Sequence, residues 1–161
     1  IGRMAAKCAK TFGMKIIYFN RNKLSEDLED GAKYFSDVNS MMPECDFVSI
    51  HTPATVETKH ILNTTSIGLP KHAVVINTSR GSTIDDDALI EALQNNKIYA
   101  AGLDVYKGEP NLNPGYLKIK TAFILPHLGS ATKHTRTAMA NLAIDNIDEF
   151  FNTDNCKNKV N

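Results

Sequence analysis

The stretch HAVVINTSRG (residues 72–81) contains a predicted strand followed by a polar loop, and it is the starting point for predicting the fold. Its first half is a nearly continuous apolar run, which is typical of a strand in a parallel sheet that is covered on both faces. Comparable runs are KIIYF (15–19), DFVSI (46–50), YAAGLDV (99–105) and AFIL (122–125). Helical segments lie between several of these runs. We therefore predict an α/β fold with a Rossmann-type, doubly wound parallel sheet.

The helical segments show apolar residues at helical spacing. Met4, Cys8 and Phe12 fall on one face of a first helix, which Gly13 ends. A charged helix is expected at 24–29. Another begins at Asp85, where three successive aspartates meet the positive end of the helix dipole. A long final helix over 132–151 has an apolar stripe made of Met139, Leu142, Ala143, Ile147 and Phe150.

Composition excludes several classes of protein. The chain has 161 residues, with eighteen basic and eighteen acidic side chains and no basic patch, so nucleic acid is not an expected partner. No apolar run is long enough to span a bilayer. The three cysteines form no metal-binding or disulfide pattern, and no metal site is expected. We expect a cytoplasmic protein, although any targeting segment would lie upstream of Ile1.

Three chemically useful residues follow three successive strands. Arg80 comes after the 72–77 run, Glu109 after 99–105 and His127 after 122–125. Ligands of an open parallel sheet bind beyond the carboxyl ends of its strands. Taken singly, the arginine is more often a surface residue, the glutamate a solvated carboxylate and the histidine structural. Their occurrence in series favours a site with an anion anchor and a proton donor.

The beginning of the chain indicates a dinucleotide site. Gly2 opens a helix and matches the last glycine of a G-x-G-x-x-G fingerprint. An acidic residue about twenty positions further on usually binds the ribose hydroxyls of NAD. Here the corresponding residues are Asn20, Arg21 and Asn22. Because an arginine stands where a carboxylate is usual, a cofactor with a 2′-phosphate is favoured.

The motifs resemble those of the D-2-hydroxyacid dehydrogenases. INTSRG (76–81) is similar to the family's arginine motif, GLDVYKGEP (102–110) to its glutamate motif and LPHLGSAT (125–132) to its histidine motif. HTPATVETKHILN (51–63) resembles the loop that contacts the cofactor. HLGSATKHTRTAM (127–139) most resembles the glyoxylate and hydroxypyruvate reductase branch.

The resemblance implies a role for each site residue. Arg80 would hold the carboxylate of a small 2-keto or 2-hydroxy acid, His127 would give a proton to the carbonyl, and Glu109 would orient the imidazole and favour its charged form. The remaining expected contacts are with the cofactor, NADP(H) by preference and NAD(H) as an alternative. They comprise Gly2, Arg3 and Met4 at the pyrophosphate, Asn20, Arg21 and Asn22 at the ribose, Thr52 and Pro53 at the adenosine, and Thr78, Asp104 and Gly129 at the nicotinamide.

The resemblance also implies a domain organisation. Residues 1–151 would be an NAD(P)-binding domain, and the tail 152–161 would dock on a substrate domain. In the family that domain, the first strand and the first two fingerprint glycines come earlier in the chain. We therefore expect an N-terminally truncated fold, without a neighbour on one side of the 15–19 strand and inactive as a fragment. A homodimer is also expected.

Alternative functions share these motifs. D-lactate or phosphoglycerate dehydrogenases would use the same three site residues. A dinucleotide-sensing corepressor of the same fold would keep them too, but such proteins favour NAD, which argues against that interpretation here. A formate dehydrogenase is disfavoured because that branch has glutamine near the histidine, where this chain has Pro126.

Overall fold

The computed structural model describes residues 1–160. The chain forms two compact units, Ile1–Pro126 and a second that begins at His127. Every strand lies in the first unit, and both sheets in it are parallel. The predicted α/β fold with a parallel sheet is confirmed.

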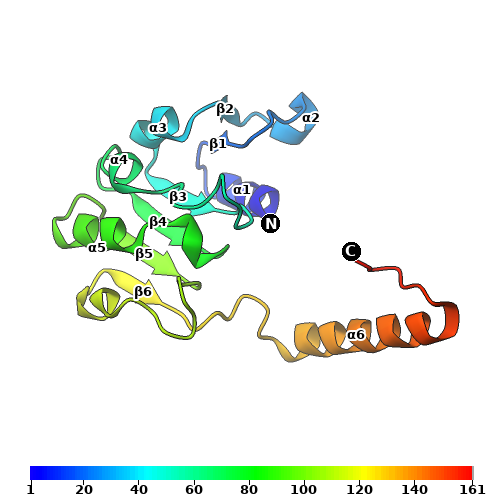
Figure 1. Ribbon diagram of the computed structural model, residues 1–161. Helices are drawn as coiled ribbons and strands as arrows, with labels where there is room; N and C mark the ends of the chain where they lie inside the picture. Colours follow the sequence, from blue (N-terminus) through cyan, green and yellow to red (C-terminus); the bar gives the residue numbers. More distant parts are fainter. Residues whose placement is uncertain (161) are drawn as a thin grey trace. The chain divides into compact units, whose positions relative to one another are not determined.

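A four-stranded sheet is the centre of the first unit. Its strands, in spatial order, are β3 (Phe47–Ile50), β4 (Val74–Asn77), β5 (Ala100–Leu103) and β6 (Ala122–Ile124) (Figure 1). In the register, Val75 lies opposite both Val48 and Ala101. The loops that follow β4, β5 and β6 therefore leave the same edge of one sheet, which is where the candidate residues were predicted.

A second sheet contains only two strands. β1 (Ile17–Phe19) pairs with β2 (Lys33–Phe35), and within residues 1–160 no ladder joins β1 to β3. This agrees with the expectation that the 15–19 strand lacks a neighbour on one side. Tyr18 and Tyr34 are opposite each other in the ladder, and their ring centroids are 5.3 Å apart, so the two strands also share side-chain packing.

The helices of the first unit are short apart from two. They are α1 (Gly2–Thr11), α2 (Glu26–Glu29), α3 (Val38–Met41), α4 (Thr64–Ile67) and α5 (Asp86–Gln94), with single 3₁₀ turns η1 (Met42–Glu44), η2 (Gly81–Thr83) and η3 (Pro114–Lys118). The Asp85 side chain caps α5 by accepting a hydrogen bond from the Ala88 N–H, as the aspartate run predicts. The helix α5 buries Leu89 and Leu93 against the core.

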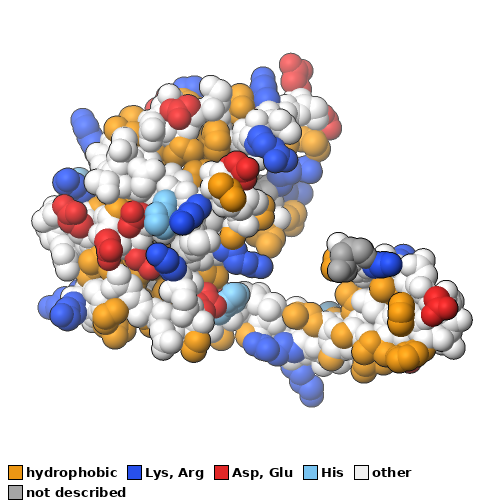
Figure 2. Space-filling view, viewed as in Figure 1, with side chains coloured by type: hydrophobic (Ala, Val, Ile, Leu, Met, Phe, Trp, Pro, Cys, Tyr) orange, Lys and Arg blue, Asp and Glu red, His pale blue; other side chains and the backbone are white. Residues whose placement is uncertain are grey.

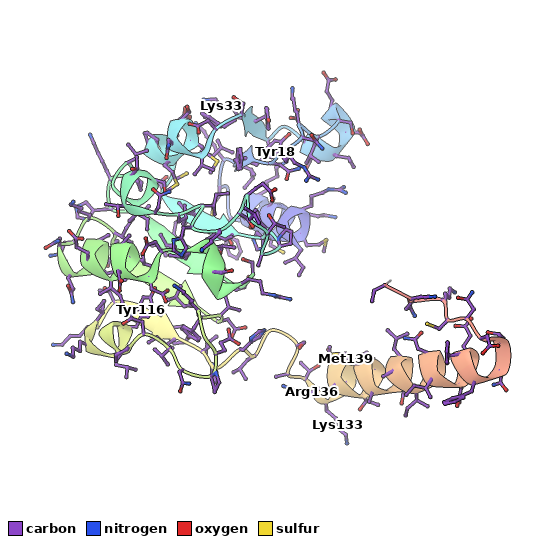
Figure 3. The ribbon with its side chains drawn as sticks, in the orientation of Figure 1. Tyr18, Lys33, Tyr116, Lys133, Arg136 and Met139 are labelled. Carbon is purple, nitrogen blue, oxygen red and sulfur yellow. The ribbon has the colours of Figure 1, made fainter. Side chains whose placement is uncertain are left out.

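The second unit is dominated by α6 (Lys133–Thr153), which begins at the Thr132 cap. Its predicted apolar stripe is present but uncovered in this unit, since Met139, Leu142, Ile147 and Phe150 are each about half exposed. Figure 2 shows hydrophobic side chains along the helix, and Figure 3 labels Met139 near its start. The tail turns back on its own helix, where the Lys157 N–H donates to Glu149 and the Asn158 amide to Asn146. The domain boundary at 151 and the docking of the tail stay predictions. Within residues 1–160, no helix combines the length and apolar character needed to cross a membrane.

Candidate active site

Arg80 is presented by a loop that a buried asparagine organises. Asn77, the last residue of β4, is 1% exposed. Its amide nitrogen donates to the Arg80 carbonyl (3.0 Å) and to the Thr83 hydroxyl (3.2 Å), and its oxygen accepts from the backbone and hydroxyl of Ser79. The Thr83 hydroxyl also donates to the Arg80 carbonyl. The backbone of Arg80 is therefore fixed, while its side chain is exposed and donates a hydrogen bond to the Ser79 carbonyl at 2.6 Å.

The residue after Arg80 brings the arginine loop against the glutamate loop. A Cβ atom at Gly81 would overlap the carbonyl group of Tyr106 and the amide nitrogen of Lys107. Only glycine permits this close approach of two backbones. The Asp104 N–H also donates to the Asn77 carbonyl at 3.0 Å. The two loops, which are about 25 positions apart in sequence, consequently pack as one piece.

Glu109 lies in a turn whose shape is set locally. The Tyr106 N–H donates to Glu109 Oε1 at 2.8 Å. Gly108 has φ of +79°, a conformation that suits glycine, and the Asn111 N–H closes the turn on its carbonyl. Asp104 is buried at the start of this loop, and Glu109 is exposed at its end. The structure thus brings Arg80, Asp104 and Glu109 into one pair of contacting loops, with Thr78 exposed at their base.

His127 is the first residue of the second unit and follows β6 after Leu125 and Pro126. The Leu125 N–H donates to the Leu103 carbonyl at 2.9 Å, so the chain is tied to β5 until just before the histidine. His127 has φ of +55°. A left-handed backbone at a non-glycine residue costs about 1 kcal/mol or more and is often retained at functional sites. Gly129 lies in the exposed turn that follows.

The predicted pyrophosphate site is the start of α1. The helix begins at Gly2 without a side-chain cap, and its first turn has no acidic residue. A Cβ atom at Gly2 would lie 3.3 Å from the Cβ of His51, so the helix start packs on the loop after β3. In that loop the Thr52 hydroxyl is buried and lacks a hydrogen-bond partner within residues 1–160. Burial lowers the pKa of His51.

The predicted 2′-phosphate site is the turn after β1. The Asn20 amide donates to the Asn22 carbonyl at 3.0 Å, and the Tyr34 hydroxyl donates to the Asn20 carbonyl at 3.3 Å. Asn20, Arg21 and Asn22 are all exposed. A hydrogen bond with Thr55 is the main cause that lowers the pKa of Glu57, and the charge of Arg21 adds to it. Glu57 and Arg21 therefore lie within electrostatic range of each other.

These features fit a dinucleotide. The uncapped N–H groups at the start of α1 are suited to a phosphate, and the buried Thr52 hydroxyl lacks the partner that a bound molecule would supply. No group of three or more His, Cys, Asp or Glu side chains within residues 1–160 is arranged to hold a metal ion.

Sequence reasoning missed three residues that shape the site. They are Asn77, Gly81 and Tyr106, none of which stands out from the motifs as a residue with a chemical role. The sequence does give a signal for Asn77, because an asparagine at the buried end of a strand must satisfy the hydrogen bonds of its amide locally. The Gly81–Tyr106 contact had no such signal, since it joins distant segments.

An open pocket beside the start of α5 is a structural feature rather than part of this site. It is lined by His60, Lys107 and the aspartates of the helix start. These aspartates have partners inside the fold: Asp85 lies 3.7 Å from His60, the Tyr116 hydroxyl donates to Asp86, and Asn113 donates to Asp87. His60 is thus paired within the fold.

Comparison with known proteins identifies the family. Residues 1–129 match the sequence model of the D-isomer specific 2-hydroxyacid dehydrogenase NAD binding domain. A glyoxylate reductase of Thermococcus litoralis is 42% identical in sequence, and the alignment covers 100% of this chain and 49% of the reductase. A glycerate dehydrogenase of Hyphomicrobium methylovorum is 38% identical, and the alignment covers 94% of this chain and 48% of the dehydrogenase. It spans about half the length of these relatives.

A solved structure agrees with the sequence matches. The crystal structure of an NADPH-dependent glyoxylate/hydroxypyruvate reductase of Sinorhizobium meliloti, in complex with NADP and malonate, superposes with a TM-score of 0.89. The sequences are 35% identical, and the match covers 96% of this chain and 48% of the other. The parallel fold, the three motif loops and these matches together show that the chain belongs to the D-isomer specific 2-hydroxyacid dehydrogenase family.

Proposed function

We propose that the complete protein reduces a small 2-keto acid, glyoxylate or hydroxypyruvate, to the D-2-hydroxy acid with NADPH. The observation that carries this proposal is the packed pair of loops that presents Arg80 and Glu109 beyond β4 and β5, beside the strand that leads to His127. An anion anchor, an orienting carboxylate and a proton donor are the groups that this reduction needs.

Each residue has a distinct task in the proposed reaction. A bound nicotinamide supplies the hydride. Arg80 binds the substrate carboxylate with its guanidinium fork and holds the carbonyl in place. His127 donates a proton to the carbonyl oxygen. Glu109 accepts a hydrogen bond from the imidazole, which orients the ring and favours its charged form.

The cofactor is proposed to extend from Gly129, Thr78 and Asp104 at the nicotinamide, past the start of α1 with Gly2, Arg3 and Met4, to Thr52 and Pro53 at the adenosine. NADPH is proposed over NADH because Arg21 makes no hydrogen bond or ion pair within residues 1–160, so its charge is available to a 2′-phosphate. Asn20 and Asn22 flank it without repelling that phosphate.

The relatives support the substrate class. The Thermococcus protein is a glyoxylate reductase, and the Sinorhizobium reductase was solved with the small carboxylate malonate. The glycerate dehydrogenase, at 38% identity, supports a second candidate function, the oxidation of a 2-hydroxy acid by the same site. We further propose that the protein acts as a homodimer.

The test is oxidation of NADPH and of NADH by the complete protein with glyoxylate and hydroxypyruvate. We expect turnover with a preference for NADPH, and a loss of about a thousandfold in kcat/KM for His127→Ala. His134→Ala is the matched control, since it removes an exposed histidine of α6 and should retain full activity. If the protein binds the dinucleotide tightly but turns over no 2-keto acid, it is a dinucleotide sensor and the proposal is wrong.

A further inference from the structure

Tyr106 has a side chain that ties the ends of two strands together. It is 8% exposed, and its hydroxyl lies 2.8 Å from the Leu103 carbonyl and 2.7 Å from the Leu125 carbonyl. The Leu103 carbonyl already accepts the Leu125 N–H. The Tyr106 hydroxyl is therefore the more important donor for the Leu125 carbonyl, which lies two residues before His127.

The backbone of the same residue touches the other two loops of the site. Its N–H donates to the carboxylate of Glu109 at 2.8 Å. Its carbonyl group occupies the space where a side chain at position 81 would begin, directly after Arg80. One residue thus contacts the loop of the arginine, the carboxylate itself and the end of the strand that leads to the histidine.

We propose that Tyr106 is a positioning residue, whose bound hydroxyl and buried ring fix the backbone that aims Glu109 and anchor the chain before His127. This inference rests on the proposed function. A carboxylate orients an imidazole only if its own geometry is fixed, and an error of about 1 Å in such a group lowers the rate by about a hundredfold.

The hydroxyl is suited to this task across the working pH range. Burial raises the pKa of Tyr106, so the group keeps the proton with which it donates. The buried ring prevents the side chain from rotating away from the two carbonyls. When the hydroxyl is removed, the Leu125 carbonyl loses its donor while the packing of the ring is preserved.

Tyr106→Phe in the complete protein tests the inference, with Tyr116→Phe as the matched control. Tyr116 is also a buried tyrosine of the first unit with a bonded hydroxyl, but it donates to Asp86 at the start of α5 (Figure 3). Removing one hydrogen bond of this kind changes the equilibrium between the folded and unfolded protein by about fivefold. We expect both variants to lose a similar amount of thermal stability.

Only Tyr106→Phe should alter catalysis. We expect kcat to fall by about fivefold, the KM for NADPH to stay unchanged and the pH profile of kcat/KM to move in the same direction as in Glu109→Gln. Amide hydrogen exchange at position 106 should also become about fivefold faster, since the backbone that holds this N–H against Glu109 is less firmly fixed.

Two outcomes overturn the inference, and they are distinct from a failure of the proposed function. If exchange at position 106 is unchanged, the hydroxyl does not hold this backbone. If Glu109→Gln moves the pH profile and Tyr106→Phe behaves like Tyr116→Phe, Tyr106 is structural only. If Glu109→Gln itself leaves the profile unchanged, the catalytic role of the carboxylate fails, and with it the inference.

Discussion

The loop of Arg80 and the turn of Arg21 differ in what lies beneath the arginine. Both arginines are exposed and both follow a parallel strand. Beneath Arg80, Asn77 is 1% exposed and makes four hydrogen bonds, and Thr83 is fully buried. Beneath Arg21, the turn has one side-chain hydrogen bond of Asn20 and a longer one from Tyr34, and all three of its residues are exposed.

The two arginines need different degrees of structural support. An arginine that holds a reacting substrate must be placed accurately, which requires buried and fully bonded support. An arginine that attracts a phosphate at the far end of a cofactor acts mainly through its charge, which tolerates movement. Substitutions should therefore affect the stability of the first region strongly and that of the second very little.

The largest effect is expected for Gly81→Ala. The added methyl group would overlap backbone atoms of Tyr106 and Lys107, which cannot move aside like a flexible side chain. We expect a loss of about 3 kcal/mol in the free energy of unfolding, measured with denaturant. Gly102→Ala in β5 is the control, because its new Cβ would have no neighbour within 4 Å. Equal stability of the two variants would contradict the close packing of the loops.

Asn77→Ala should have an intermediate effect. It leaves the buried Thr83 hydroxyl and the Ser79 N–H without their present partner, at a cost of about 2 kcal/mol. Asn20→Ala makes the same substitution in the exposed turn and should cost less than about 0.5 kcal/mol. Urea unfolding of the two variants side by side measures the comparison directly, and similar losses would show that the two regions are supported alike.

The smallest effect on stability is expected for Arg21→Gln, which should change binding instead. The turn stays intact because Arg21 does not hold it, so the thermal midpoint should remain within a degree or so of the wild type. The KM for NADPH should rise by about tenfold while that for NADH changes little. Lys23→Gln is the control, since Lys23 lies 3.7 Å from Glu29 and is already paired. An equal rise for both cofactors would disprove the phosphate role.

The sequence predicted the strands better than the short helices. All five apolar runs became strands, each within the predicted range, because a continuous β-branched run in a buried sheet has few alternatives. The strand β2 and the helices α3 and α4 were missed. They have three or four residues each, which is too short for a periodic pattern to appear. The helices α3 and α4 are instead marked by local caps, Asp37 and Asn63, which a periodicity search does not detect.

The positions of two candidate site residues could be predicted from the sequence, whereas the packing that supports them could not; their catalytic roles stay predictions. Arg80 and Glu109 lie after β4 and β5, as predicted. They could be found in the sequence because charged residues stand out beside apolar strands. The Asn77 network could have been anticipated from the cost of burying an amide. The packing of Gly81 on Tyr106 could not, because it depends on the register of β4 and β5, which no local pattern encodes.

The backbone contact at Gly81 has a mechanical consequence. Since the two loops touch through backbone atoms without an intervening side chain, neither can be displaced without the other. A carboxylate that draws Arg80 inward would push on the peptide between Tyr106 and Lys107, and the peptide would carry Glu109 with it. If Arg80 binds the substrate carboxylate as proposed, that binding would thus be transmitted, through about one peptide unit, to Glu109.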